Sequence, residues 1–297
     1  MSSASQTRAY AALLLIVTLW GSYPAFAKLA LTDLPPFLLV FLRISLASVF
    51  LLLLLSRRGW AEARALTRED LWPFAWLGFA GIFVSTGFTY LAIYLTTASN
   101  TVILQASTPV MVAVGARIYL KERLSRIQWL GVVCSGAGVL LVITNGRVAA
   151  LRLQELRAGD FVVLLAITGW TVYTIYGKRV LAVHSPAVAT TMAYMLGTLM
   201  LLPLALLTAP LFPAPRLASP TAWGVVLYQA LLGALAHVWW YEGVRAVGAS
   251  RSAIFMNVQP LVGVVLAAGM LGETISVAQI MGGLGVVVGL ALTTRQR

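Results

Sequence analysis

The sequence predicts an all-α integral membrane protein, with ten transmembrane helices arranged as two inverted five-helix repeats. Composition, the number of apolar runs and an internal repeat lead to this fold class. Of the 297 residues, 60% are hydrophobic and only 10% are charged. Soluble domains carry about a quarter of their residues as charged side chains, so this composition indicates a chain that folds in lipid.

Apolar runs separated by charged residues, proline or glycine define the expected helices. A spanning helix needs about 20 apolar residues, and ten of them with short loops use the whole chain, which leaves no room for a catalytic domain outside the membrane. The first run is a full-length span and not the shorter apolar core of a signal peptide. We expect helices near residues 9–28, 36–56, 71–94, 98–118, 127–144, 159–178, 186–208, 221–244, 250–271 and 277–294.

The distribution of basic residues predicts the orientation of these helices. With the N-terminus in the cytoplasm, the inner connections hold 15 of the 21 Lys and Arg residues, the outer connections hold five, and Arg43 lies within the second helix. Cytoplasmic loops carry the excess of Lys and Arg in membrane proteins. We therefore expect both termini in the cytoplasm, and the formal net charge of +12 needs no nucleic acid to explain it.

The chain also repeats itself. A shift of 151 residues aligns 90–138 with 241–289 with 13 identical positions among 49, where apolar bias alone would match roughly a tenth. A shift of 150 pairs Trp20 with Trp170.

The repeat implies two halves, residues 1–150 and 151–297. Because each half has an odd number of helices, the second half must enter the membrane from the opposite side. Inverted repeats are typical of secondary transporters, whose halves rock about a site at the bilayer midplane.

The best-matched segments, residues 98–142 and 249–292, share a set of features. Each contains a proline within a helix, a glutamate at the helix end and a following glycine-rich helix. Here the sequence resembles the EamA family of the drug/metabolite transporter superfamily, and the resemblance covers essentially the whole chain. The residues that carry it are Leu19, Trp20, Gly21, Lys28, Phe41, Leu42, Arg43, Pro109, Glu122, Pro260 and Glu273.

The resemblance implies ten helices, a central cavity between the halves, and alternating access that most often exports small metabolites. The proportions look most like bacterial amino-acid exporters, including those for aromatic amino acids. We therefore expect a protein of the bacterial inner membrane.

Aromatic and amide side chains gather on the helices that border the cavity in this family. Polar groups at such depth need partners, and an apolar pocket with a few placed polar groups is typical of a ligand site. Membrane-interface belts are the alternative for aromatic residues, and we expect one to hold Trp60, Trp72, Trp129 and Trp223. We expect the substrate to contact Trp20, Tyr23, Tyr90, Tyr94, Gln105, Trp170, Tyr173, His237, Trp240, Tyr241 and Asn257.

Three further residues are expected to shape or gate the cavity. Pro109 and Pro260 each free a backbone carbonyl one turn earlier, which must face protein or a water-filled cavity. They mark kinks that act either in gating or only as bends. Arg43 matches the family's arginine in the second helix, and we expect it to hold carbonyls or a carboxylate near the outer side.

Other ionisable residues have simpler interpretations. Glu122 and Glu273 each precede a helix, and we expect them to cap its N-terminal amides rather than carry protons. Glu242 is expected to pair with Arg245 three residues later. His237 either titrates during transport or is a hydrogen-bonded core histidine.

Glycines recur in the fifth and tenth helices and allow close helix approach. These helices either pack against each other or dimerise, and we favour internal packing. The glycines are Gly131, Gly136, Gly138, Gly282, Gly285 and Gly289.

The function predicted from these features is secondary export of small neutral or zwitterionic metabolites, above all amino acids. The chain has no P-loop and no metal-site spacing, so we expect no enzyme activity, cofactor or metal. The expected partners are a small-molecule substrate and the lipid bilayer, without nucleic acid or a protein partner. Multidrug, nucleobase or sugar-phosphate transport and a non-transporting membrane protein are the alternatives.

Sugar-phosphate transport would require cationic side chains in the cavity. Near the cavity we expect only Arg43, Lys28 and Lys178, all towards helix ends, so the sequence does not favour this alternative.

Overall fold

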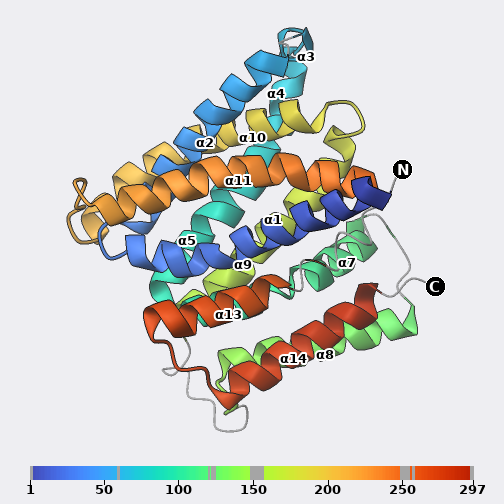
Figure 1. Cartoon of the computed structure of the whole chain (residues 1–297), viewed down its shortest axis with the longest axis vertical. Helices are drawn as coiled ribbons and strands as arrows, with labels where there is room; N and C mark the ends of the chain where they lie inside the picture. The colour runs from blue at the N-terminus through green and yellow to red at the C-terminus, as the bar shows by residue number, and fades with distance from the viewer. Residues whose placement is uncertain are drawn as a thin grey trace.

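The computed structural model describes residues 3–58, 61–119, 121, 125–147, 157–247, 255 and 258–294. All regular elements in these ranges are helices (Figure 1). They are α1 (Ser3–Ala30), α2 (Pro36–Arg58), α3 (Ala61–Arg64), α4 (Arg68–Leu77), η1 (Gly78–Gly87), α5 (Phe88–Leu95), α6 (Ala98–Gln105), α7 (Thr108–Tyr119), α8 (Arg126–Ile143), α9 (Ala158–Val180), α10 (Pro186–Thr208), η4 (Ala209–Leu211), α11 (Pro220–Val247), α13 (Val258–Leu271) and α14 (Val277–Thr294).

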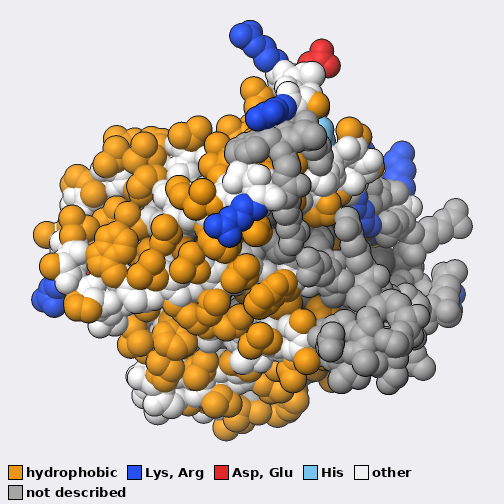
Figure 2. Space-filling model, turned by 45° about the horizontal axis from the view of Figure 1, so that its top comes forward, with side chains coloured by type: hydrophobic (Ala, Val, Ile, Leu, Met, Phe, Trp, Pro, Cys, Tyr) orange, Lys and Arg blue, Asp and Glu red, His pale blue; other side chains and the backbone are white. Residues whose placement is uncertain are grey.

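Within the described residues, seven helical segments are long and apolar enough to cross a membrane. Three further apolar segments are shorter there, 220–236, 258–271 and 277–293. Large apolar side chains such as Leu53 and Val133 point outwards, and Figure 2 shows hydrophobic side chains over most of the described surface in view. Such a surface suits a lipid solvent.

Where the structure describes them, the expected boundaries agree with the observed helices to within a few residues, apart from α1, which begins at Ser3. The range predicted at 186–208 is that of α10, whose first turn is set by the N-cap Ser185 and by Pro186. Two expected helices are not uniform. The third consists of α4, η1 and α5 in succession, with η1 a π-helix, and the fourth is broken between α6 and α7.

Two helices in opposite halves begin with the same device. Ser125 and Gln128 form a capping box at the start of α8, in which the Ser125 amide donates to Gln128 Oε1 at 2.8 Å. Ser276 and Gln279 repeat it at α14, again at 2.8 Å between the amide and Oε1. A capping box satisfies two free donors of a helix start, so positions paired by the internal repeat perform the same local task.

Helices α8 and α14 pack along their glycines. A Cβ atom on Gly289 would lie 2.5 Å from the Gly131 carbonyl oxygen, and one on Gly138 would lie 2.5 Å from the Gly282 carbonyl oxygen. The prediction of internal packing between these helices is confirmed.

Other helix contacts surround α1, α9 and α2. Helix α1 packs against α11 and α13, and α9 packs against η1, α5, α6 and α7. Helix α2 packs against α10. In Figure 1, α1 begins and α14 ends at the same end of the bundle.

Candidate functional site

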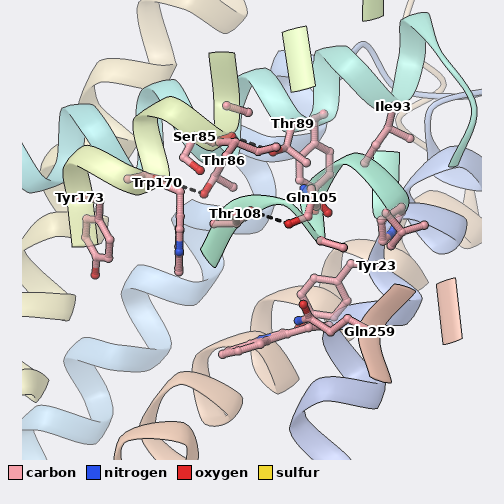
Figure 3. A pocket seen from close by; sticks show the side chains of 18 of the residues that line it. Tyr23, Ser85, Thr86, Thr89, Ile93, Gln105, Thr108, Trp170, Tyr173 and Gln259 are labelled. Atoms are coloured by element: carbon pink, nitrogen blue, oxygen red, sulfur yellow. Dashed lines mark hydrogen bonds between the residues drawn. The ribbon is translucent and has the colours of Figure 1, made fainter. Parts of the chain in front are cut away.

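A cavity of about 200 Å³ lies among α1, α2, η1, α5, α6, α7, α9, α10, α13 and α14. Figure 3 shows it from close by, with Trp170 and Tyr173 on α9, and with Tyr23 and Gln259 contributed by α1 and α13. Nine of the residues predicted to bind substrate or shape the cavity line it: Trp20, Tyr23, Arg43, Tyr90, Gln105, Pro109, Trp170, Tyr173 and Pro260.

The other predicted residues do not join them in the described structure. Tyr94 is not a lining residue, because it lies one turn beyond Tyr90 at the end of α5, where its ring meets Phe212 edge-on with centroids 5.3 Å apart. Four predicted positions are outside the described residues or have side chains that are: His237, Trp240, Tyr241 and Asn257.

The same holds for Trp60, Glu122 and the expected pair of Glu242 with Arg245. The expected belt residues Trp72, Trp129 and Trp223 are exposed.

One wall of the cavity is the π-helix η1, which the sequence analysis missed. The Thr86 hydroxyl donates to the Gly81 carbonyl at 2.9 Å, five residues back, and the Thr89 hydroxyl donates to the Ser85 carbonyl at 2.8 Å. Close packing fixes this segment, because a Cβ on Gly81 would lie 2.4 Å from the Tyr173 ring. Single π-turns are often found at functional sites. The ten-residue π-helix η1 lies beside the cavity, which agrees with a functional role for the cavity.

Aromatic pairs from α1 and α9 also line the cavity. Trp170 and Tyr173 on α9 have ring centroids 5.3 Å apart, and Trp20 and Tyr23 occupy the corresponding positions of α1. Both pairs border the same space, which gives it indole and phenol surfaces.

Pro109 breaks the fourth expected helix beside the cavity. Helix α6 ends at Gln105, and the freed Gln105 carbonyl accepts a hydrogen bond from the Thr108 hydroxyl at 2.6 Å. The predicted kink and its freed carbonyl are therefore confirmed at Pro109. Pro260 lies in the first turn of α13, and its predicted partner Met256 is outside the described residues.

Arg43 lies beside the cavity as predicted, but its partners differ from the prediction. Its side chain lines the cavity and the residue is only 7% exposed, because α2 brings it against α5 and α11 two turns from its start. Its partners are not carbonyls or a carboxylate: Nη1 donates to Tyr90 Oη at 2.9 Å, and Cζ lies 5.0 Å from the Tyr23 ring centroid. The carbonyl or carboxylate partners expected for Arg43 are therefore not found among the described residues, where tyrosines take their place.

A hydrogen-bonded chain holds Arg43 in place. The Tyr90 hydroxyl donates to Gln229 Oε1, and Gln229 Nε2 donates to the Tyr23 carbonyl oxygen at 3.0 Å. Gln229 is 1% exposed. The sequence analysis did not select Gln229, although an amide in the middle of an apolar helix is the signal that identified Gln105.

Polar contacts join several helices at one end of the bundle. Lys28 Nζ donates to two carbonyl oxygens at the C-terminal end of α5, that of Ile93 at 2.6 Å and that of Thr96 at 2.5 Å. Glu273 accepts from the amides of Ala98 at 2.8 Å and Ser99 at 3.0 Å. Glu273 is therefore a cap as predicted, but of α6 and not of the helix that follows it.

Asp160 continues these contacts into the second half. It is 1% exposed and accepts from Thr96 Oγ1 at 2.5 Å and from Asn100 Nδ2 at 3.1 Å. Asn100 Oδ1 in turn accepts from Gln279 Nε2 at 2.7 Å. We call the set Lys28, Thr96, Asn100, Asp160, Glu273 and Gln279 the polar cluster.

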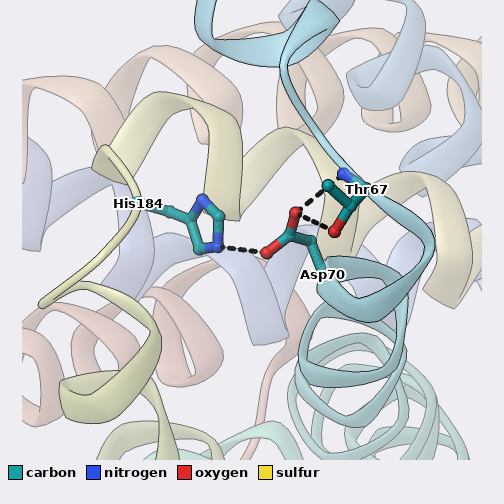
Figure 4. Close-up of polar contacts among 3 residues, drawn as sticks. All are labelled: Thr67, Asp70 and His184. Carbon is teal, nitrogen blue, oxygen red and sulfur yellow. Dashed lines mark hydrogen bonds and ion pairs between the residues drawn. The ribbon is translucent and has the colours of Figure 1, made fainter.

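A second polar contact ties α4 to the connection between α9 and α10 (Figure 4). His184 Nε2 lies 3.1 Å from Asp70 Oδ1, and Asp70 Oδ2 accepts from both the amide and the hydroxyl of Thr67 at 2.8 Å. None of these three residues lines the cavity, and Thr67 and Asp70 cap the start of α4. Among the described residues, no group of three or more His, Cys, Asp or Glu is placed to hold a metal.

Comparison with known proteins points to one family. The EamA-like transporter family matches the chain twice, over residues 7–144 and 157–295. The uncharacterized transporter YetK of Bacillus subtilis is 30% identical over 295 residues, 95% of this chain and 87% of YetK. An uncharacterized transporter of Archaeoglobus fulgidus is 29% identical over 289 residues, 96% of each chain.

The uncharacterized inner membrane transporter YedA of Escherichia coli K12 is 25% identical over 283 residues, 94% of this chain and 88% of YedA. A solved crystal structure superposes with a TM-score of 0.61 over 97% of both chains at 18% identity. That likeness shows a shared fold.

Proposed function

Because the chain belongs to the EamA-like transporter family, and is a membrane transporter of that type, we propose that it exports small neutral or zwitterionic metabolites by alternating access. Amino acids, including aromatic ones, are the substrates that the cavity suits best. The observation that carries this proposal is the cavity itself, lined by two Trp–Tyr pairs and by the amides of Gln105 and Gln259. Aromatic side chains of a substrate stack on such surfaces, and amides bind its polar groups.

The architecture proposed for this function is ten helices in two inverted repeats, with both termini in the cytoplasm of a bacterial inner membrane. Three observations support it. The family matches each half separately, the capping boxes of α8 and α14 lie at paired positions, and α1 begins at the end of the bundle where α14 ends. An inverted repeat allows one half to rock against the other about a central site.

Cation efflux has less support from the cavity. Exchange of protons for cations calls for a carboxylate within the membrane, and no Asp or Glu is among the described lining residues.

Flux into proteoliposomes tests the proposal. Purified protein is reconstituted, and uptake of radiolabelled Phe, Trp, Thr, Met and Lys is followed with and without an imposed pH gradient, with protein-free liposomes as the control. Saturable uptake of neutral amino acids is the expected result. Uptake of none of them in vesicles that hold folded protein contradicts it.

A further inference from the structure

The buried guanidinium of Arg43 stands in the cavity without a counter-ion. Among the described residues, no carboxylate lies within ion-pair distance of it, and its Nε is buried without a hydrogen-bond partner. From this geometry we infer that Arg43 and the Tyr23 hydroxyl bind a carboxylate of the transported solute, and that a carboxylate is required for recognition while an ammonium group is not. This inference rests on the proposed function and names the group that its site selects.

Tyr23 supplies a second donor at the same place. Its hydroxyl is also buried without a hydrogen-bond partner, and its ring lies against the guanidinium of Arg43. Gly233 of α11 makes room for both groups, because a Cβ there would lie 2.8 Å from Tyr23 Oη and 3.4 Å from Arg43 Nη2. The Tyr23 hydroxyl and the Arg43 guanidinium therefore lie side by side against Gly233, and both residues line the cavity.

Burial of an unpaired cation is costly, and more so within a membrane span. The rings of Tyr23 and Tyr90 offset part of that cost through cation–π contact. A carboxylate would offset the remainder, since charge-assisted hydrogen bonds to a guanidinium are about twice as strong as neutral ones. The positive charge of Arg43 is thus left unbalanced among the described residues, and an anionic group on the solute balances it.

The anchor is held ready for its ligand. The chain from Tyr90 to Gln229 to the Tyr23 backbone joins α5, α11 and α1 around Arg43. A fixed donor loses little conformational freedom on binding, which favours affinity.

The lining also explains why the ammonium is dispensable. No Asp or Glu is among the described lining residues, so an amine without a carboxylate would add a second positive charge beside Arg43. A solute with an aromatic body and a carboxylate meets both parts of the site, the indoles of Trp20 and Trp170 and the guanidinium.

Binding of three matched probes to the purified full chain tests this inference by titration calorimetry. L-Phenylalanine carries both charged groups, 3-phenylpropionate only the carboxylate and phenethylamine only the ammonium. We expect L-phenylalanine and 3-phenylpropionate to bind with dissociation constants within about threefold of each other. Phenethylamine should bind at least about tenfold more weakly than either. Phenethylamine that binds as tightly as 3-phenylpropionate overturns the inference, and so does a failure of both carboxylates to bind.

Variants separate binding from a structural role of Arg43. Tyr23→Phe removes one hydroxyl. It is expected to weaken the binding of L-phenylalanine and 3-phenylpropionate about three- to tenfold and to leave the binding of phenethylamine unchanged. Tyr119→Phe, at an exposed tyrosine of α7, is the matched control and should change nothing. Arg43→Gln is expected to abolish the preference for carboxylates, and Arg43→Lys to restore part of it, because lysine keeps the charge but not the planar fork.

An Arg43 that only joins helices gives a different result: Arg43→Gln then lowers the melting temperature and weakens all three probes equally. The two proposals also fail separately. Without amino-acid flux the proposed function fails, whereas flux with no preference for the carboxylate overturns only the present inference.

Discussion

Single residues show where physical chemistry acts most strongly in this protein. Arg43, Tyr90 and Gln229 form a chain of buried polar groups in which each member satisfies the next. Such chains are stabilising when complete and costly when one member is lost. Sequence reasoning identified Arg43 and Tyr90 but gave Arg43 the wrong surroundings, because the register of α2 against α5 decides which groups the guanidinium meets.

Gln229→Leu is expected to destabilise the protein. It keeps the side-chain volume but leaves the Tyr90 hydroxyl without its acceptor, which costs about 1–3 kcal/mol for a buried group. The melting temperature of the protein in detergent is the measurement. Thr18→Val is the control, since the Thr18 hydroxyl on the exposed face bonds only its own helix, and it should shift stability by less than about 0.5 kcal/mol. Equal effects of the two substitutions would contradict the role given to Gln229.

At the scale of elements, the helices could be read from the sequence and their interruptions could not. Apolar runs and the residues that separate them placed α10 at its observed bounds, because span length and proline punctuation are local. The π-helix η1 depends on contacts from elsewhere, such as Gly81 against Tyr173 on α9. Likewise Glu273 precedes α14 in sequence but caps α6 in space, a choice that only the packing of α13 beside α6 makes.

The contacts between α8 and α14 predict that a larger side chain at position 138 lowers the stability of the protein. Gly138→Ala places a Cβ 2.5 Å from the Gly282 carbonyl oxygen, and overpacking of this kind costs about 1–3 kcal/mol. Gly136→Ala is a control in the same helix, because nothing lies within 4 Å of its Cβ, and alanine there gains up to about 1 kcal/mol of helix propensity. Melting temperatures of both variants test this, and a Gly138→Ala protein as stable as Gly136→Ala would refute the close packing.

The polar cluster makes a prediction about movement. We expect the polar cluster to close one end of the cavity during transport. Glu273→Gln removes the charge that caps α6, which should destabilise the closed end by about 1–2 kcal/mol and let it open more often. We expect a cysteine introduced at the lining residue Ala106 to react faster with a membrane-impermeant thiol reagent added from the side of Glu273.

Asp33→Asn is the matched control for that experiment. Asp33 accepts from Ser219 Oγ at 2.6 Å, apart from the polar cluster, so its substitution should leave the labelling rate unchanged. Equal labelling of the Glu273→Gln and unsubstituted proteins would show that the cluster does not limit access.

On the scale of the whole molecule, a chain with only 10% charged residues encloses a polar-edged cavity among helices from both halves. The sequence could predict the membrane class and nine of the lining residues, since Trp20 and Trp170 lie at paired positions and apolar runs show which residues lie deep in the membrane. It could not predict that Tyr94 would turn to Phe212 or that Gln229 would be needed. Those outcomes depend on helix rotation, which hydropathy alone leaves open.

The most direct test of the account is the kinetics of phenylalanine uptake into proteoliposomes that hold the Trp170→Ala protein. Trp170 lines the cavity, so loss of its indole should raise KM by about tenfold or more through lost stacking and burial. Trp72→Ala, at a tryptophan that is 72% exposed on the outer surface, should leave KM and maximal rate unchanged. Uptake by Trp170→Ala that matches the unsubstituted protein would show that the solute does not pass through this cavity.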